Sequence, residues 1–367
     1  MNALLTKANS IIREERPLDT PTMIITTFRR NNFLQLTFQT SGCRYSSLGT
    51  CTMCNYGKGV TADSQIILHE LDQVCCSKDF LECNMILLGA SGSFLDESEI
   101  PEELQYAIMK RIAQTHMKEV YIETHYKSVT ASKLHSIHTI FPYKCICIEM
   151  GLETITNEFQ DNILNKNISL NELKFVMNQI HTYGMTVSLN ILLGLPFLTK
   201  DEQLADTRKS IEWAIENGAD EIVVFPINIQ PYTVFEWWYK NGYIELPSMW
   251  LLVELLLNLP DNVLPYIYLS WYGNRSIFYS SEKKTITPYV CTNCQPKLLS
   301  FFEDFASSFS LEFRKQKLHK LVHTHFLCDC RQRITEKAKS MTEVSEGFQW
   351  NAAHSALERW INKHAIN

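Results

Sequence analysis

Residues 145–193 contain two short apolar segments, CICIEMG at Cys145–Gly151 and VSLNILL at Val187–Leu193. Between them, Ser169–Tyr183 repeats apolar residues at the spacing of an amphipathic helix. A strand, a helix and a second strand in this order predict two parallel strands joined by a right-handed crossover. This unit decides the fold class, because the chain repeats it in both directions.

The same alternation of strand and helix patterns extends through the first two thirds of the chain. Six strands alternating with five helices predict an α/β fold with a parallel sheet, either doubly wound or a full or partial (βα) barrel. In both architectures the functional loops follow the carboxyl ends of the strands. The further strands are expected at Leu34–Thr40, Asn84–Gly89, Val120–Glu123 and Glu221–Ile227, and the further helices at Leu68–Leu81, Pro101–His116, Ser128–His138 and Lys200–Asn217.

The composition is that of an ordinary globular protein. Of 367 residues, 45% are hydrophobic and 20% are charged, which excludes a disordered or fibrous chain. The net charge of −6 gives no overall attraction to nucleic acid or to an anionic membrane. The longest apolar runs are too short to cross a bilayer, and residues 1–16 have no signal-peptide pattern. We therefore expect a cytoplasmic protein with no membrane partner.

Three cysteines form a compact group after the first expected strand. Cys43, Cys51 and Cys54 have the spacing C-x7-C-x2-C within Ser41–Gly57, SGCRYSSLGTCTMCNYG. Three thiolates can hold three irons of a [4Fe–4S] cluster and leave the fourth iron open to S-adenosylmethionine, as a radical S-adenosylmethionine enzyme requires. Zinc is the competing metal for this site, but no His, Asp or Glu lies between Ser41 and Gly59 to serve as its fourth ligand.

Several further segments carry a resemblance to a known family. A small-residue turn, Gly89–Ser93, follows the second expected strand and continues as SGSFLD at Ser91–Asp96. The cysteine group, this segment, EMGLE at Glu149–Glu153 and the stretch Asn228–Trp250 occur in the order found in archaeosine synthase beta subunits. These are radical S-adenosylmethionine proteins, and the chain resembles them over roughly residues 30–335.

The resemblance implies a partial (βα)6 TIM-type radical S-adenosylmethionine barrel at residues 31–230. An N-terminal extension at residues 1–30 precedes it, and an α-rich, cysteine-containing region at 231–367 follows. It implies that Cys43, Cys51 and Cys54 hold the cluster. Glu153 is expected to accept hydrogen bonds from the ribose hydroxyls, and the Met53 thioether to pack on adenine. The expected S-adenosylmethionine contacts are Met53, Gly89, Ser91, Gly92, Ser93, Glu123, Glu153 and Asn190. For Glu123, at a strand end, the substrate is the alternative to the methionine group.

The reaction implied by the resemblance is cleavage of S-adenosylmethionine to a 5′-deoxyadenosyl radical that breaks a C–N bond of a lysine adduct. That adduct is carried on a modified 7-deazaguanine of tRNA, and the implied partners are a transferase subunit and an electron donor such as flavodoxin or ferredoxin. The alternative substrate is a small metabolite or natural-product intermediate. A third interpretation is a non-enzymatic, zinc-stabilised binding module.

A second cysteine group lies downstream. Cys291-x2-Cys294 is a chelating pair, and Cys328-x-Cys330 can complete four thiolates. Structural zinc, an auxiliary iron–sulfur cluster and no metal are the alternatives. The remaining five cysteines lie in apolar sequence and are expected to be buried.

Overall fold

Eight strands form a single sheet in the described part of the chain, and their spatial order equals their sequence order. The computed structural model describes residues 2–18, 24–56, 58–270, 272, 285–324, 328–331 and 350–364. The strands are β1 (Ile25–Arg30), β2 (Phe33–Phe38), β3 (Met85–Ala90), β4 (Glu119–Glu123), β5 (Cys145–Glu153), β6 (Thr186–Leu193), β7 (Glu221–Pro226) and β8 (Ile267–Leu269).

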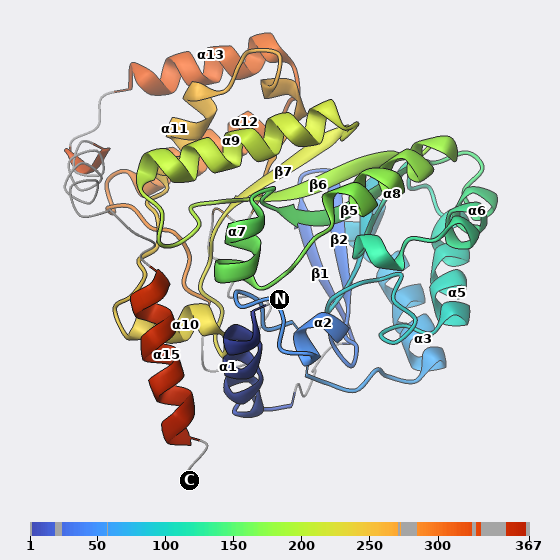
Figure 1. The fold of residues 1–367 in the computed structure, drawn as a ribbon. Helices are drawn as coiled ribbons and strands as arrows, with labels where there is room; N and C mark the ends of the chain where they lie inside the picture. The colour runs from blue at the N-terminus through green and yellow to red at the C-terminus, as the bar shows by residue number, and fades with distance from the viewer. Residues whose placement is uncertain are drawn as a thin grey trace.

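The strand order decides between the two architectures expected from the sequence. All neighbouring pairs from β2 to β8 are parallel, and the order never reverses, as a doubly wound sheet would require. The sheet therefore curls in one direction with its helices outside (Figure 1), which confirms a partial TIM-type barrel. The six expected strands correspond to β2–β7. Strand β8 and the antiparallel strand β1 were not expected.

Many of the helices begin at a residue whose side chain caps the first turn. Thr199 and Glu202 form a reciprocal capping box at the start of α9. The expected helix Leu68–Leu81 is two helices, because the Ser77 side chain accepts the Phe80 N–H and starts a new one. The longer helices are α1 (Ala3–Glu14), α3 (Ser64–Cys75), α5 (Glu102–Ala113), α6 (Ala131–Ile140), α8 (Leu170–Thr182), α9 (Lys200–Glu216), α10 (Val234–Lys240), α11 (Trp250–Asn258), α12 (Gln295–Ala306), α13 (Leu311–Val322) and α15 (Trp350–His364); α2 (Arg44–Ser47), α4 (Lys78–Leu81) and α7 (Asn157–Phe159) are short.

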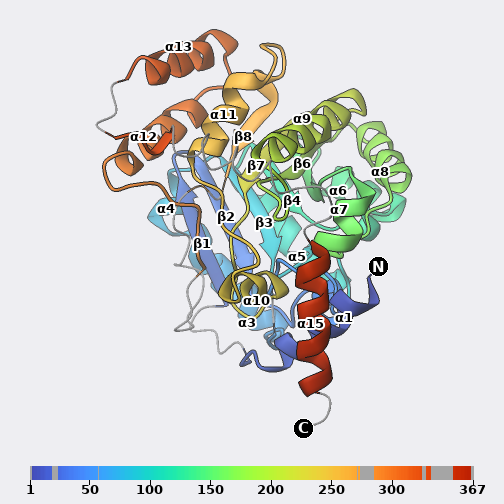
Figure 2. The ribbon, with the colours of Figure 1, turned by 60° about the vertical axis from the view of Figure 1, so that its left-hand side comes forward.

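The barrel is open between β1 and β8, and Arg30 links these edges. Its guanidinium donates to the Leu269 carbonyl at 3.0 Å and pairs with Glu303 of α12 at 3.0 Å. The strand order places β1 and β8 at the two borders of the sheet. Figure 2 shows α11, α12 and α13 grouped near β8.

The N-terminal helix supports the end of the barrel that carries the cysteine loop. Helix α1 packs against α15 and α10, and the three lie together in Figure 1. The buried Asn9 amide of α1 donates to the Thr50 carbonyl at 2.9 Å, inside the cysteine loop. None of the helices in the described residues combines the length and apolarity needed to span a bilayer.

Candidate active site

A cavity of about 480 Å³ occupies the inside of the curled sheet. Its walls come from alternate residues of the strands, because successive strand side chains point to opposite faces. On β4 and β5 these inward residues are Tyr121, Glu123, Glu149 and Gly151, and on β6 and β7 they include Asn190 and Glu221. The cavity reaches the carboxyl ends of the strands, where loop residues complete it: Cys51, Met53, Cys54, Ser91, Gly92, His125, Glu153, Lys166 and Gln230.

The cysteine loop is held at this end of the barrel by its backbone. The Thr52 N–H donates to the Leu164 carbonyl at 3.0 Å, and the Asn55 N–H donates to Oε1 of Gln230 at 3.0 Å. Cys51 has a φ of 59°, an unusual conformation for a residue with a side chain. Cys51 and Cys54 face the cavity, and Cys43 caps the N-terminus of α2. Gly57, at the end of the expected segment, lies outside the described residues.

Gly92 brings the loop after β3 directly onto Cys43. A Cβ atom added to Gly92 would lie 2.4 Å from Cβ of Cys43 and 2.8 Å from Oε2 of Glu99. Only glycine permits this approach. The Gly89–Ser93 turn and the cysteine loop are therefore packed together, as their expected shared role requires.

Burial controls the chemistry of the three thiols. It raises the pKa of Cys43 to about 12 and also raises the pKa of Cys51 and Cys54. Without a metal the thiols are therefore protonated at neutral pH, and metal binding must release their protons. In the described part of the chain, the sulfur atoms of Cys43, Cys51 and Cys54 do not all lie within 4.8 Å of one another. The three sulfurs are therefore not gathered around a single small ion.

Glu153 stands at an irregular end of β5. The pairing of β5 with β6 shifts between Gly151 and Glu153, and Glu153 has a φ of 67°. The bulge turns this carboxylate into the cavity, where Oε1 pairs with Nζ of Lys166 at 2.5 Å. Burial is the largest single effect and by itself would lower the pKa of Lys166. The charge of Glu153 and its hydrogen bond, together with the neighbouring Cys51 and Cys54, outweigh burial, and the pKa is raised. Among the described residues, the buried Oε2 of Glu153 has no hydrogen-bond partner.

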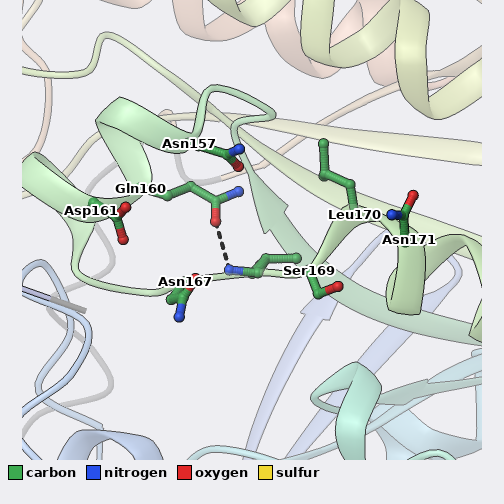
Figure 3. A pocket seen from close by; sticks show the side chains of 8 residues that line it. Asn157, Gln160, Asp161, Asn167, Ser169, Leu170 and Asn171 are labelled. Atoms are coloured by element: carbon green, nitrogen blue, oxygen red, sulfur yellow. Dashed lines mark hydrogen bonds between the residues drawn. The ribbon is translucent and has the colours of Figure 1, made fainter.

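One loop positions both Lys166 and the cysteine segment. It begins with a π-helical turn, Gln160–Leu164, whose Ile163 carbonyl accepts the Thr52 hydroxyl at 2.5 Å. Figure 3 shows Gln160 turned toward the chain before α8; its Oε1 accepts the Ile168 N–H at 2.6 Å. The hollow in that view, with Asn157 and Asn171 at its sides, contains none of the site residues expected from the sequence.

The loops that follow β3 and β4 are joined by hydrogen bonds. The Ser93 hydroxyl lies 2.7 Å from that of Thr124 and accepts the His125 N–H at 3.0 Å. Ser93 therefore connects two loops and does not line the cavity, unlike Ser91 and Gly92. Gly89 makes room for Glu123, since a Cβ there would lie 3.0 Å from Oε2 of that residue.

His125 is stacked between two tyrosines at the cavity wall. Its ring centroid lies 4.0 Å from that of Tyr45 and 4.7 Å from that of Tyr126. Burial, aided by the charges of Lys166 and Lys127, lowers the pKa of His125 to about 3. Because Nδ1 accepts the Lys127 N–H at 3.2 Å, the neutral ring carries its proton on Nε2.

Asn190 faces the cavity as expected. It is hydrogen-bonded to Glu149, a residue to which the sequence analysis gave no role. Its amide donates to Oε1 of Glu149 at 3.0 Å, and its buried Oδ1 lacks a partner among the described residues. Glu149 could have been found from its period-two spacing to Gly151 and Glu153 within EMGLE. Lys166 could not, because the Asn165–Asn167 loop carries no local pattern.

The second cysteine group is also brought together, away from this cavity. The sulfurs of Cys291, Cys294, Cys328 and Cys330 all lie within 4.8 Å of one another, and none lines the cavity. Of the other five cysteines, Cys83 and Cys147 are buried as expected. Cys76 and Cys145 are exposed, so that expectation was wrong for them.

Comparison with known proteins agrees with the resemblance stated from the sequence. The chain is 27% identical to archaeosine synthase subunit beta of Methanosarcina acetivorans over 227 residues, which are 61% of this chain and 65% of that protein. It is 27% identical to the subunit of the same name from Thermococcus kodakarensis over 225 residues, 59% of this chain and 69% of that one. The matched region thus spans slightly less than two thirds of the first relative.

Among solved structures, the chain resembles coproporphyrinogen III oxidase of Escherichia coli, described as a radical SAM enzyme. The TM-score is 0.43 at 16% identity, covering 80% of this chain and 61% of that one. No family model matches the chain.

Proposed function

We propose that this protein is a radical S-adenosylmethionine enzyme in which Cys43, Cys51 and Cys54 hold a [4Fe–4S] cluster. The observation that carries the proposal is the convergence of the three thiols with Gly92 and Glu153 at the carboxyl ends of parallel strands. Two buried acceptors in that cavity, Oε2 of Glu153 and Oδ1 of Asn190, lack partners among the described residues. A bound nucleoside has the hydroxyl and amino groups to satisfy them.

When bound, a [4Fe–4S] cluster with one open iron supplies the electron that splits S-adenosylmethionine into methionine and a 5′-deoxyadenosyl radical. The chain provides the surroundings. Glu153 accepts hydrogen bonds from the ribose diol, and the ion pair with Lys166 orients this carboxylate. Met53 offers its thioether to the adenine face. The apolar parts of the wall, including Leu87 and Val223, keep water away from a reactive intermediate.

The proposed reaction is cleavage of a C–N bond in a lysine adduct on a modified 7-deazaguanine of tRNA. The sequence similarity to two archaeosine synthase beta subunits supports it. The cavity adds independent support, because Glu123, Glu149 and Glu221 give its interior a carboxylate lining. Such a lining suits a cationic amine better than a phosphate. A transferase partner and a low-potential electron donor belong to the same proposal.

A small-molecule substrate is the second candidate, and the size of the cavity favours it. A volume of about 480 Å³ lies in the range of ordinary small-ligand sites, roughly 300–1,000 Å³. To distinguish the two substrates, reconstituted protein is incubated with reductant, S-adenosylmethionine and tRNA carrying the adduct. The tRNA is then digested, and the masses of the modified nucleosides are measured by mass spectrometry. Loss of the lysine carbon chain supports the tRNA reaction. Unchanged tRNA, together with 5′-deoxyadenosine released only on adding the free lysine–deazaguanine adduct, supports the small molecule.

A further inference from the structure

We propose that Cys291, Cys294, Cys328 and Cys330 bind one tetrahedral zinc ion that fastens two distant segments of the C-terminal region to the barrel. The first pair lies at the start of α12, and the second lies in the described segment 328–331. This site shares no residue with the cavity, and its occupancy does not depend on the proposed radical chemistry.

The distances between the sulfurs fit a single ion with four thiolate ligands. Five of the six pairs are 3.0, 3.1, 3.3, 3.4 and 3.7 Å apart. The sixth pair, Cys291 and Cys294, lies within 4.8 Å. Four thiolates around one zinc ion, each about 2.3 Å from it, lie about 3.8 Å from one another. The sulfurs thus occupy the corners of a small tetrahedron of nearly that size.

Two alternatives are disfavoured by the same distances. An auxiliary iron–sulfur cluster is a cube that stands between its four thiolates and holds them much farther apart. Two disulfides would bring two pairs to about 2.05 Å and would not equalise the remaining distances. Cys328 instead has three sulfur neighbours at 3.0–3.4 Å, and every sulfur is free. A central ion common to all four accounts for this arrangement.

The surrounding side chains complete the site. The indole N–H of Trp250, at the start of α11, donates to Sγ of Cys330 at 3.2 Å. Arg331 lies over the Trp250 ring at 5.5 Å and pairs with Glu254 at 3.0 Å. A tetrathiolate zinc site has a net charge of −2, which an N–H donor and a nearby guanidinium stabilise. Cys294 is fully buried, so one ligand is fixed in the core.

The zinc ion would also fix the segment that precedes Cys291 at the rim of the cavity. The segment before Cys291 pairs Ile286 with Ile229, and both N–H···O bonds are 2.9 Å long. Ile229 stands between Asn228 and Gln230, which line the cavity. Tyr289 forms a second bridge, to Ser248. Zinc binding at Cys291 and Cys294 therefore anchors a segment that borders the cavity.

The direct test is elemental analysis of protein purified in air, where an oxygen-sensitive cluster is destroyed but zinc persists. We expect about one zinc per chain in the wild type, none in Cys328→Ser/Cys330→Ser, and one in the matched control Cys76→Ser/Cys145→Ser, which changes two exposed cysteines. Cobalt-loaded wild type should show the intense visible absorption of a tetrahedral thiolate site. Amide exchange at Ile229 and Ile286 should quicken in the zinc-free variant.

Three results overturn the proposal: a wild type without zinc, zinc retained in Cys328→Ser/Cys330→Ser, or disulfides detected by non-reducing mass spectrometry. About four irons per chain lost from the anaerobic protein with that same variant would show an auxiliary cluster instead. If the double variant does not fold, Trp250→Phe keeps all four ligands and removes only the N–H donor. It should weaken zinc affinity roughly 10–100-fold in chelator competition, and unchanged affinity contradicts the assigned site.

Discussion

Nζ of Lys166 lies 2.5 Å from Oε1 of Glu153 at the carboxyl end of β5, where the Glu153 side chain is buried and the Lys166 side chain is 13% exposed. The two residues come from different elements, a bulged strand end and the loop after a π-helical turn. Their pairing leaves Oε2 of Glu153 for a ligand, so the ion pair both stabilises the fold and orients the carboxylate. These two roles can be separated by mutation.

The first prediction concerns Glu153→Gln. We expect S-adenosylmethionine binding to weaken about tenfold or more with the iron content unchanged, because a charge-assisted hydrogen bond contributes about 1.5–3 kcal/mol. The variant should also lose about 3–5 kcal/mol of stability, since Lys166 is left buried and unpaired. Calorimetry and denaturant unfolding measure the two effects.

The control for that prediction is Glu153→Gln/Lys166→Met, in which no charge is left uncompensated. It should recover much of the lost stability but none of the lost affinity. Recovery of binding in the double variant would mean that the first variant failed through misfolding and that the ribose contact lies elsewhere.

The second prediction is that Gly92→Ala displaces the cysteine loop and lowers cluster occupancy by more than half. The added methyl group cannot share space with Cys43, whose Cβ would be 2.4 Å away. Gly184→Ala is the matched control, because its φ of +72° gives strain while its Cβ meets nothing within 4 Å. It should cost about 1–2 kcal/mol of stability without loss of iron. Equal iron content in both variants contradicts the proposed packing.

The third prediction follows from the pKa of His125, which is lowered from 6.5 to about 3 in the folded protein. Between these values the unfolded chain binds the extra proton, so His125 costs stability progressively as pH falls below 6.5. The variant His125→Gln has no titratable group at this position and does not lose stability in this way. From pH 7.5 to 5.0 the stability of the wild type should fall by as much as about 2 kcal/mol more than that of the variant. If the stability of the wild type and that of the variant change equally with pH, the pKa of His125 is not lowered in the folded protein.

The sequence predicted the parallel core well because apolar periodicity is a local property. Strands β2–β7 and their helices begin and end within a few residues of the expected positions. β1 was missed because Ile25–Arg30 alternates weakly and ends in two arginines. Its place is fixed by pairing with β2, and Arg30 is used to link the barrel edges. The three residues of β8 are too few to show a period.

The candidate site was predictable where residues follow strands and was missed where tertiary contacts position them. Glu123, Glu153 and Asn190 were expected at the cavity and lie there. The Ser93 hydroxyl joins two loops, and the expected contact of Ser93 with the cofactor stays a prediction. Lys166 reaches Glu153 only because the π-helical turn redirects its loop, and no sequence period encodes that contact.

The central claim is that Cys43, Cys51 and Cys54 hold a cluster that cleaves S-adenosylmethionine. The most direct measurement is 5′-deoxyadenosine formed by the anaerobically reconstituted protein with dithionite, in the wild type and in Cys43→Ala/Cys51→Ala/Cys54→Ala. The control Cys76→Ala/Cys145→Ala removes two exposed thiols. We predict formation in the wild type and the control, and none in the triple variant. Undiminished 5′-deoxyadenosine from the triple variant would contradict the account.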